Sequence, residues 1–248
     1  MSPYLAEFIG TALLVILGNG VVANVVLERT KGQGGGWIVI TAGWGFAVFV
    51  GAFCAAPISG AHINPAVTLA MACTGQLPWA QAPGYIGAQL AGGIVGGSLV
   101  YFFYREHFKL SADADAKLAC FATAPNIRHL PQAFFCEVLG TFVLILPIFL
   151  MTQPSMKFPV GAVTSDVGVG LGTIGLIPVA LLVFAIGLSL GGTTGYAINP
   201  ARDLGPRLAH AFLPIPGKRN SGWGYAWVPV AGPLVGALLA VAARKVLI

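Results

Sequence analysis

Two short polar motifs interrupt an otherwise apolar chain: SGAHINPAVT at residues 59–68 and TGYAINPARD at residues 194–203. Each contains the tripeptide Asn-Pro-Ala, formed by Asn64, Pro65 and Ala66 in the first motif and by Asn199, Pro200 and Ala201 in the second. An asparagine amide donates and accepts hydrogen bonds without carrying charge, so the pair could bind a neutral molecule with hydroxyl groups. Neither motif sets a nucleophile beside a base and an orienting group, which argues against an enzyme.

Each tripeptide also predicts where a helix begins. Asparagine is a favoured N-cap, and proline suits the first helical position because it has no N–H that would need a partner. The helix after Asn64 is expected to run to about Thr74, before Gly75 and Pro78. Ten or eleven residues give about 16 Å, roughly half of a hydrocarbon core. Such a helix cannot cross a bilayer, so we predict two re-entrant half-helices.

The composition indicates a membrane protein. The chain has 248 residues, of which 56% are hydrophobic and 8% charged, with a mean hydropathy of +0.83. Soluble domains contain about 25% charged residues, so this chain has too little charge to cover a surface that faces water. We predict an all-α protein with six spans and a single membrane domain over residues 1–248, the spans lying near 4–27, 36–56, 83–104, 132–152, 174–192 and 224–247.

Other chemical roles find little support in the sequence. The net charge is +5, but lysine and arginine lie at span ends, and no basic patch predicts a nucleic-acid partner. The four cysteines have no CxxC spacing and predict neither a disulfide, a metal site nor another cofactor; they are Cys54, Cys73, Cys120 and Cys136.

The chain repeats itself in order. LAEFIGTALLVIL at 5–17 matches FCEVLGTFVLIL at 135–146, and LAGGIVGG at 90–97 matches VAGPLVGA at 230–237. Three spans precede the halfway point, so the second copy must start from the opposite side of the membrane. We therefore predict an inverted 3+3 repeat, approximately 1–110 and 131–248, with its site at the midplane between the two copies.

The two half-helices would meet at their Asn-Pro ends. Each helix N-terminus is equivalent to about half a positive charge, so a cation or proton there would be raised in energy. The asparagine amides can donate hydrogen bonds to a neutral solute such as water or a small alcohol. The carbonyls before them can accept hydrogen bonds; they belong to Gly60, Ala61, His62, Gly195, Tyr196 and Ala197.

A coupled secondary transporter is the alternative, because inverted repeats and broken helices also serve that class. Ion coupling normally needs titratable groups in the solute path. Apart from Glu7 and Glu137, the spans supply almost none. The sequence therefore favours a passive channel.

These residues resemble the aquaporins, or major intrinsic proteins, and within them the glycerol facilitators. The resemblance covers essentially the whole chain, including Glu7, Glu137, both Asn-Pro-Ala motifs and NPARDLGPR at 199–207. It implies a right-handed bundle of six spanning helices and two half-helices, assembled in the bilayer as a homotetramer. It further implies that each protomer conducts glycerol and other small uncharged solutes, with water, and excludes ions and protons.

The resemblance also implies a second constriction, the selectivity filter, formed by Trp44, Gly187, Tyr196 and Arg202. Water-selective members carry histidine where Gly187 stands, so glycine is expected to leave space there. The two aromatic rings would face the carbon edge of a polyol and Arg202 its hydroxyls. Asp203, Arg207 and Pro229 resemble the glycerol branch as well. A water channel, or a channel for undissociated lactic acid, dihydroxyacetone or urea, stays open as an alternative.

Several residues are expected to support the pore. Glu7 and Glu137 should accept hydrogen bonds from the loops before the half-helices, with a proton relay as the alternative. His62 should line the vestibule or brace its loop, with pH sensing as the alternative, and Asp203 should shape the outer loop. The Gly-rich segment 152–172, with its single Asp166, is a candidate gate.

The orientation receives two opposite predictions. The resemblance implies a cytoplasmic N-terminus in the plasma or inner membrane of a bacterium. The outer connections would then hold most of the basic residues, namely Arg29, Lys31, Arg105, Lys109, Lys117, Arg128, Lys218 and Arg219, against chiefly Lys157, Arg244 and Lys245 inside. The positive-inside rule predicts the reverse.

Overall fold

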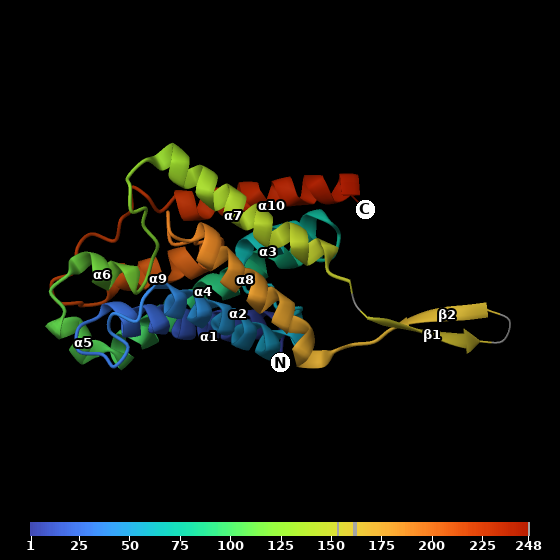
Figure 1. The fold of residues 1–248 in the computed structure, drawn as a ribbon, viewed down its shortest axis with the longest axis horizontal. Helices are drawn as coiled ribbons and strands as arrows, with labels where there is room; N and C mark the ends of the chain where they lie inside the picture. The colour runs from blue at the N-terminus through green and yellow to red at the C-terminus, as the bar shows by residue number, and fades with distance from the viewer. Residues whose placement is uncertain (153, 161–162, 248) are drawn as a thin grey trace.

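The computed structural model describes residues 1–152, 154–160 and 163–247, which form a helical bundle with a hairpin projecting from one end (Figure 1). In this described part, six helices are long and apolar enough to cross a membrane. They are α1 (Pro3–Val26), α2 (Trp37–Ser59), α4 (Ala82–Phe103) after the 3₁₀ turn η1 (Trp79–Gln81), α7 (Leu130–Leu150), α8 (Ile177–Leu190) after η2 (Gly172–Leu176), and α10 (Val228–Leu247). Each coincides with a predicted span, so the multi-pass α-helical fold is confirmed.

Both predicted half-helices are present, as α3 (Pro65–Cys73) and α9 (Pro200–Phe212). Oδ1 of Asn64 accepts the N–H of Ala66 at 2.9 Å, and Oδ1 of Asn199 accepts the N–H of Ala201 at 3.0 Å. Each asparagine therefore caps the helix that its proline begins. Two further short helices, α5 (Arg105–Leu110) and α6 (Ala114–Ala119), lie between α4 and α7.

The halves of the chain interlock through the half-helices. Helix α3 packs against α10, and α9 packs against α4, so each half-helix contacts the last long helix of the other half. The contact between α4 and α9 is backbone against backbone, because a Cβ added to Gly205 would lie 2.9 Å from the Cα of Gly93. In the motif at 90–97, Gly93 and Gly97 approach α9 closely, whereas the glycines of the motif at 230–237 approach α7.

A two-stranded hairpin was not expected. Strands β1 (Ser155–Val160) and β2 (Val163–Gly168) pair antiparallel, with Ser155 opposite Gly168. Within the candidate gate at 152–172, residues 153, 161 and 162 lie outside the described residues. The two strands pair their facing edges with each other, and the hairpin extends beyond the bundle (Figure 1).

Figure 1 distinguishes two ends of the bundle. We call the end that holds both chain termini and the hairpin the terminal end. The opposite end, where α5 and α6 lie, is the loop end. Large apolar side chains also cover the outside of the bundle, for example Phe46 on α2 and Phe103 on α4, which are 69% and 82% exposed. An apolar exterior of this kind suits contact with lipid.

Candidate functional site

The two re-entrant loops meet through a reciprocal pair of hydrogen bonds. Nδ2 of Asn64 donates to the carbonyl of Ile198 at 2.9 Å, and Nδ2 of Asn199 donates to the carbonyl of Ile63 at 2.8 Å. Each asparagine oxygen already caps its own half-helix. Because an amide nitrogen carries two hydrogens, each side chain keeps a second N–H for another acceptor. Both asparagines line a cavity of about 260 Å³ at the terminal end.

Both loops hold left-handed backbone at non-glycine residues. The φ angles are +53° at Ala61 and +43° at Ile63 in the first loop, and +36° at Tyr196 and +43° at Ile198 in the second. A β-branched residue is rarely found there, and such a conformation costs about 1–3 kcal/mol. The surrounding structure must therefore hold each loop in place.

Glu7 supports the first loop from α1. Its Oε1 accepts the N–H of His62 at 2.9 Å and the hydroxyl of Ser59 at 2.6 Å. Its Oε2 accepts the N–H of Ile63 at 2.6 Å and the side-chain amide of Gln89 at 2.7 Å. Gln89 was not among the predicted site residues, although an isolated amide in an apolar span was a signal that could have identified it.

Glu137 supports the second loop in the same manner from α7. Its Oε1 accepts the hydroxyl of Thr194 at 2.8 Å and the N–H of Ala197 at 3.0 Å, and its Oε2 accepts the N–H of Ile198 at 2.9 Å. Glu7 and Glu137 are both fully buried. Their oxygens are engaged by the loops, as the predicted supporting role requires, and neither glutamate lines the cavity at the terminal end.

The cavity at the terminal end has a wall of loop residues. Gly60, Ala61, His62 and Ala197 all contribute to it. The ring of His62 packs against Tyr85 with centroids 5.0 Å apart, and its Nδ1 lies 3.2 Å from the hydroxyl of Thr68. His62 therefore both lines the cavity and braces its loop.

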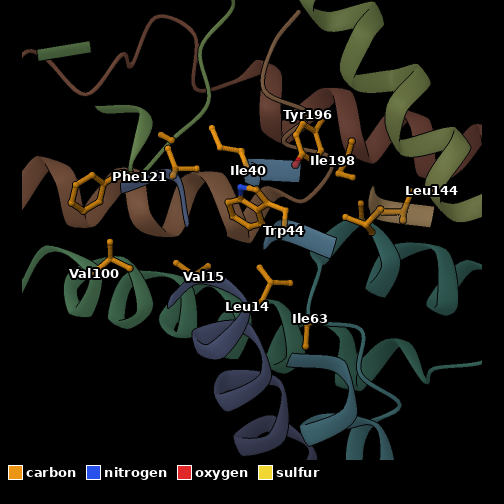
Figure 2. Close-up of a cluster of buried hydrophobic side chains, with 14 of the residues drawn as sticks. Leu14, Val15, Ile40, Trp44, Ile63, Val100, Phe121, Leu144, Tyr196 and Ile198 are labelled. Atoms are coloured by element: carbon orange, nitrogen blue, oxygen red, sulfur yellow. The ribbon is translucent and has the colours of Figure 1, made fainter. Parts of the chain in front are cut away.

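A second cavity, of about 840 Å³, opens at the loop end. Trp44, Tyr196 and Arg202 line both cavities, so they lie where the two meet. Figure 2 shows Trp44 of α2 near Tyr196 of the second loop. The guanidinium carbon of Arg202 lies 4.1 Å from the centre of the Trp44 ring, and its Nη2 donates to the carbonyl of Gly195 at 3.1 Å. Arginine has five N–H donors, more than this one carbonyl can accept.

Gly187, which is expected to leave space at the constriction, packs closely against Tyr196 and Thr41. A Cβ added there would lie 2.9 Å from both Cζ of Tyr196 and Cγ2 of Thr41. The space beside this glycine is therefore taken by the edge of the Tyr196 ring. Trp37, which was not among the predicted site residues, donates its indole N–H to the Gly187 carbonyl at 2.9 Å. Its spacing of seven residues from Trp44 on one helix was the available signal.

Asp203 is paired with Arg207 and lines neither cavity. The two side chains are fully buried, with Nη2 of Arg207 2.7 Å from Oδ1 of Asp203. Oδ2 of Asp203 also accepts the N–H and the hydroxyl of Thr123, at 2.7 and 2.6 Å. Arg207 donates to the carbonyl of Ser221 at 2.7 Å. These contacts join α9 to two segments at the loop end.

Comparison with known proteins identifies the family to which this chain belongs. The family described as "Major intrinsic protein" matches residues 1–243. The chain belongs to the major intrinsic protein family. Within that family it is 53% identical to the "Probable glycerol uptake facilitator protein" of Thermotoga maritima, with 96% of each chain covered. It is 51% identical to "Glycerol uptake facilitator protein 3" of Lactiplantibacillus plantarum, covering 95% of this chain and 92% of the relative.

A solved structure of the same family superimposes over nearly all of the chain. The aquaglyceroporin from Plasmodium falciparum matches with a TM-score of 0.81 and 31% identity, covering 98% of this chain and 95% of that one. The bundle with two half-helices is therefore the arrangement of a solved major intrinsic protein. In the described residues, no group of three histidine, cysteine, aspartate or glutamate side chains could hold a metal ion.

Proposed function

We propose that this chain is a passive channel that conducts glycerol and other small uncharged solutes, together with water. The observation that carries the proposal is the junction of the two cavities, where two aromatic rings face one fixed guanidinium close to the paired asparagines. The carbon edge of a polyol can pack on Trp44 and Tyr196 while its hydroxyls accept from Arg202. Two relatives with 53% and 51% sequence identity are named as glycerol uptake facilitators, which supports the same solute class.

In this proposal, positive charge at the centre of the pore excludes cations and protons. The N-termini of α3 and α9 meet at Asn64 and Asn199, and each is equivalent to about half a positive charge. Arg202 adds a full charge at the junction. A cation or proton is repelled there, whereas a neutral solute accepts hydrogen bonds from the asparagine amides. Ion coupling normally needs titratable groups in the solute path, and neither Glu7 nor Glu137 lines the terminal-end cavity. The flux in this proposal therefore follows the solute gradient alone.

The channel is proposed to act as a homotetramer in the plasma or inner membrane of a bacterium, with its N-terminus in the cytoplasm. The terminal-end cavity is then the inner vestibule and the loop-end cavity the outer one. We also infer that residues 1–110 and 131–248 are inverted repeats. The reciprocal asparagine contacts and the matched contacts of Glu7 and Glu137 support this inference.

The first test is stopped-flow light scattering on proteoliposomes. The wild-type protein should give fast shrinkage in an impermeant osmolyte and fast re-swelling in glycerol. Replacing Arg202 by leucine should lower the ratio of glycerol to water permeability about tenfold, because glycerol loses charged hydrogen-bond donors while water gains space. Arg105→Leu, at an exposed arginine outside both cavities, should leave the ratio unchanged.

The alternative functions give different results in the same experiment. Fast shrinkage without re-swelling in glycerol would identify a water channel. A glycerol flux that depends on an ion gradient would identify a coupled transporter. Either result contradicts the proposed function.

Gly187→Ala is expected to reduce glycerol permeability about fivefold and water permeability less, because overpacking here moves the Tyr196 ring. The added Cβ would meet Tyr196 and Thr41 at 2.9 Å. Gly20→Ala is a matched control, since a Cβ there meets no atom within 4 Å. Equal glycerol permeability in the two variants would show that the Tyr196 ring position does not limit the solute.

A further inference from the structure

Trp37 lies at the start of α2 and contacts the junction from behind. Its ring meets that of Tyr196 edge to face, with centroids 5.9 Å apart and an interplanar angle of 79°. Its indole N–H donates to the carbonyl of Gly187 at 2.9 Å. Trp37 is therefore fixed to α8 and to the second re-entrant loop at the same time.

The Tyr196 ring is closely packed by Gly187, Gly191 and Trp37. A Cβ on Gly191 would lie 2.4 Å from Cδ1 of Tyr196 and 2.9 Å from Cζ2 of Trp37. One on Gly187 would meet Cζ and the hydroxyl of Tyr196 at 2.9 Å. The tyrosine therefore rests against two glycines and the edge of an indole. Its remaining side faces the cavities and Arg202, whose guanidinium carbon lies 5.9 Å from the ring centre.

Helix α2 contributes residues that contact both Arg202 and Tyr196 at the junction. Trp37, Thr41 and Trp44 are spaced at i, i+4 and i+7, which places them on one helix face. Trp44 stacks on Arg202, whereas Trp37 supports Tyr196. Two tryptophans on one helix therefore contact the residues on either side of the gap between Tyr196 and Arg202.

We propose that Trp37 is a positioning residue that sets the width of this gap and so limits the size of the polyol that passes. The proposal rests on the channel function proposed above. Trp37 acts through Tyr196, because its ring contacts the Tyr196 ring and the residue lines only the loop-end cavity. When the indole is removed, Tyr196 can move into the vacated space and away from Arg202. A four-carbon polyol such as erythritol should then pass more easily relative to glycerol.

The test compares erythritol and glycerol permeability in the same proteoliposomes. Trp37→Leu should raise the erythritol-to-glycerol ratio about fivefold, because a large-to-small change leaves space that Tyr196 can enter. Trp37→Phe keeps an aromatic ring but has no donor for the Gly187 carbonyl, and should give a smaller rise. Trp79→Leu is the matched control, since Trp79 is 60% exposed and lines neither cavity.

A ratio measured in one vesicle preparation does not depend on how much protein is folded, so general destabilisation alone would leave it unchanged. An unchanged ratio in Trp37→Leu overturns the proposal. If that variant does not assemble, an unchanged ratio in Trp37→Phe overturns it instead. A wild-type protein that passes no glycerol rejects the channel function and the role of Trp37 together. Wild-type glycerol flux with an unchanged variant ratio rejects only the role of Trp37.

Discussion

Replacing Arg207 by methionine is expected to lower the free energy of unfolding by about 3–5 kcal/mol, because it leaves the buried carboxylate of Asp203 without its cation. The pair is fully buried, with Nη2 of Arg207 2.7 Å from Oδ1 of Asp203. Arg207 also donates to the carbonyls of Ser221 at 2.7 Å and Thr123 at 2.8 Å. Methionine fills much of the volume but donates to none of these acceptors.

The measurement is thermal unfolding in one detergent, with Arg219→Met as the matched control. Arg219 pairs with Asp115, but both side chains are exposed to solvent, and such a pair contributes about 0–1 kcal/mol. Arg207→Lys should destabilise less than Arg207→Met, because the ammonium group keeps a cation beside Asp203 but cannot reproduce the planar fork that also contacts Ser221 and Thr123. Equal melting temperatures for Arg207→Met and Arg219→Met would show that burial adds nothing to the pair.

A double replacement separates the charge from the packing. Asp203→Leu combined with Arg207→Leu removes both charges and should cost less than the sum of the two single changes. A double variant that is as unstable as that sum would mean that the side chains act independently. In that case their contacts with Thr123 and Ser221, rather than the ion pair, would hold α9 to the loop end.

The contacts of the basic residues give a physical reason for the conflict over orientation. Nζ of Lys218 donates to the carbonyls of His210, Ala211 and Leu213 at 2.7, 2.8 and 2.7 Å, which satisfies the C-terminal end of α9. Burial lowers the pKa of Lys218 below its ordinary value. Lys117 is buried and donates to the carbonyl of Pro216. A count of lysine and arginine treats these side chains as free surface charges, although they serve the fold.

The sequence was most informative about features that depend on residues close together in the chain. A span is recognised by its apolar length, and the start of each half-helix by Asn-Pro, because capping involves neighbouring residues only. Those features predicted the six spans and the ends of α3 without knowledge of any contact. The glycine motif at 90–97 indicated the internal repeat, but its close packing against α9 was not predicted.

Residues that act through distant contacts were harder to predict. Gln89 reaches Glu7 across 82 positions, and Trp37 reaches Gly187 across 150. Such partners are set by the packing of helices, which composition and spacing do not specify. The hairpin at β1 and β2 was missed for a different reason. Its strands are short and lie in a Gly-rich connection, where the alternation of side chains is weak.

Replacing Glu137 by glutamine is expected to lower the free energy of unfolding by about 1–3 kcal/mol, because glutamine has one acceptor oxygen where the loop needs two. Ala197 donates to Oε1 of Glu137 and Ile198 to Oε2. In either orientation of the new amide, one of these buried N–H groups faces an NH₂ group. Ile198 has a φ of +43°, and its carbonyl accepts from Asn64, so its displacement reaches the asparagine pair. The substitution should therefore lower the glycerol flux as well as the free energy of unfolding.

Glu7→Gln should have an effect of the same size, because His62 and Ile63 donate to its two oxygens in the same pattern. Thr11→Val and Thr141→Val are matched controls. They lie four residues further along α1 and α7 and are fully buried, and the Thr141 hydroxyl donates only within its own helix. Thermal unfolding and glycerol re-swelling should change in both glutamine variants and in neither control. Loss of thermal stability and glycerol flux in Glu7→Gln, with wild-type behaviour in Glu137→Gln, would contradict the paired arrangement. The second loop would then keep its left-handed backbone without the carboxylate.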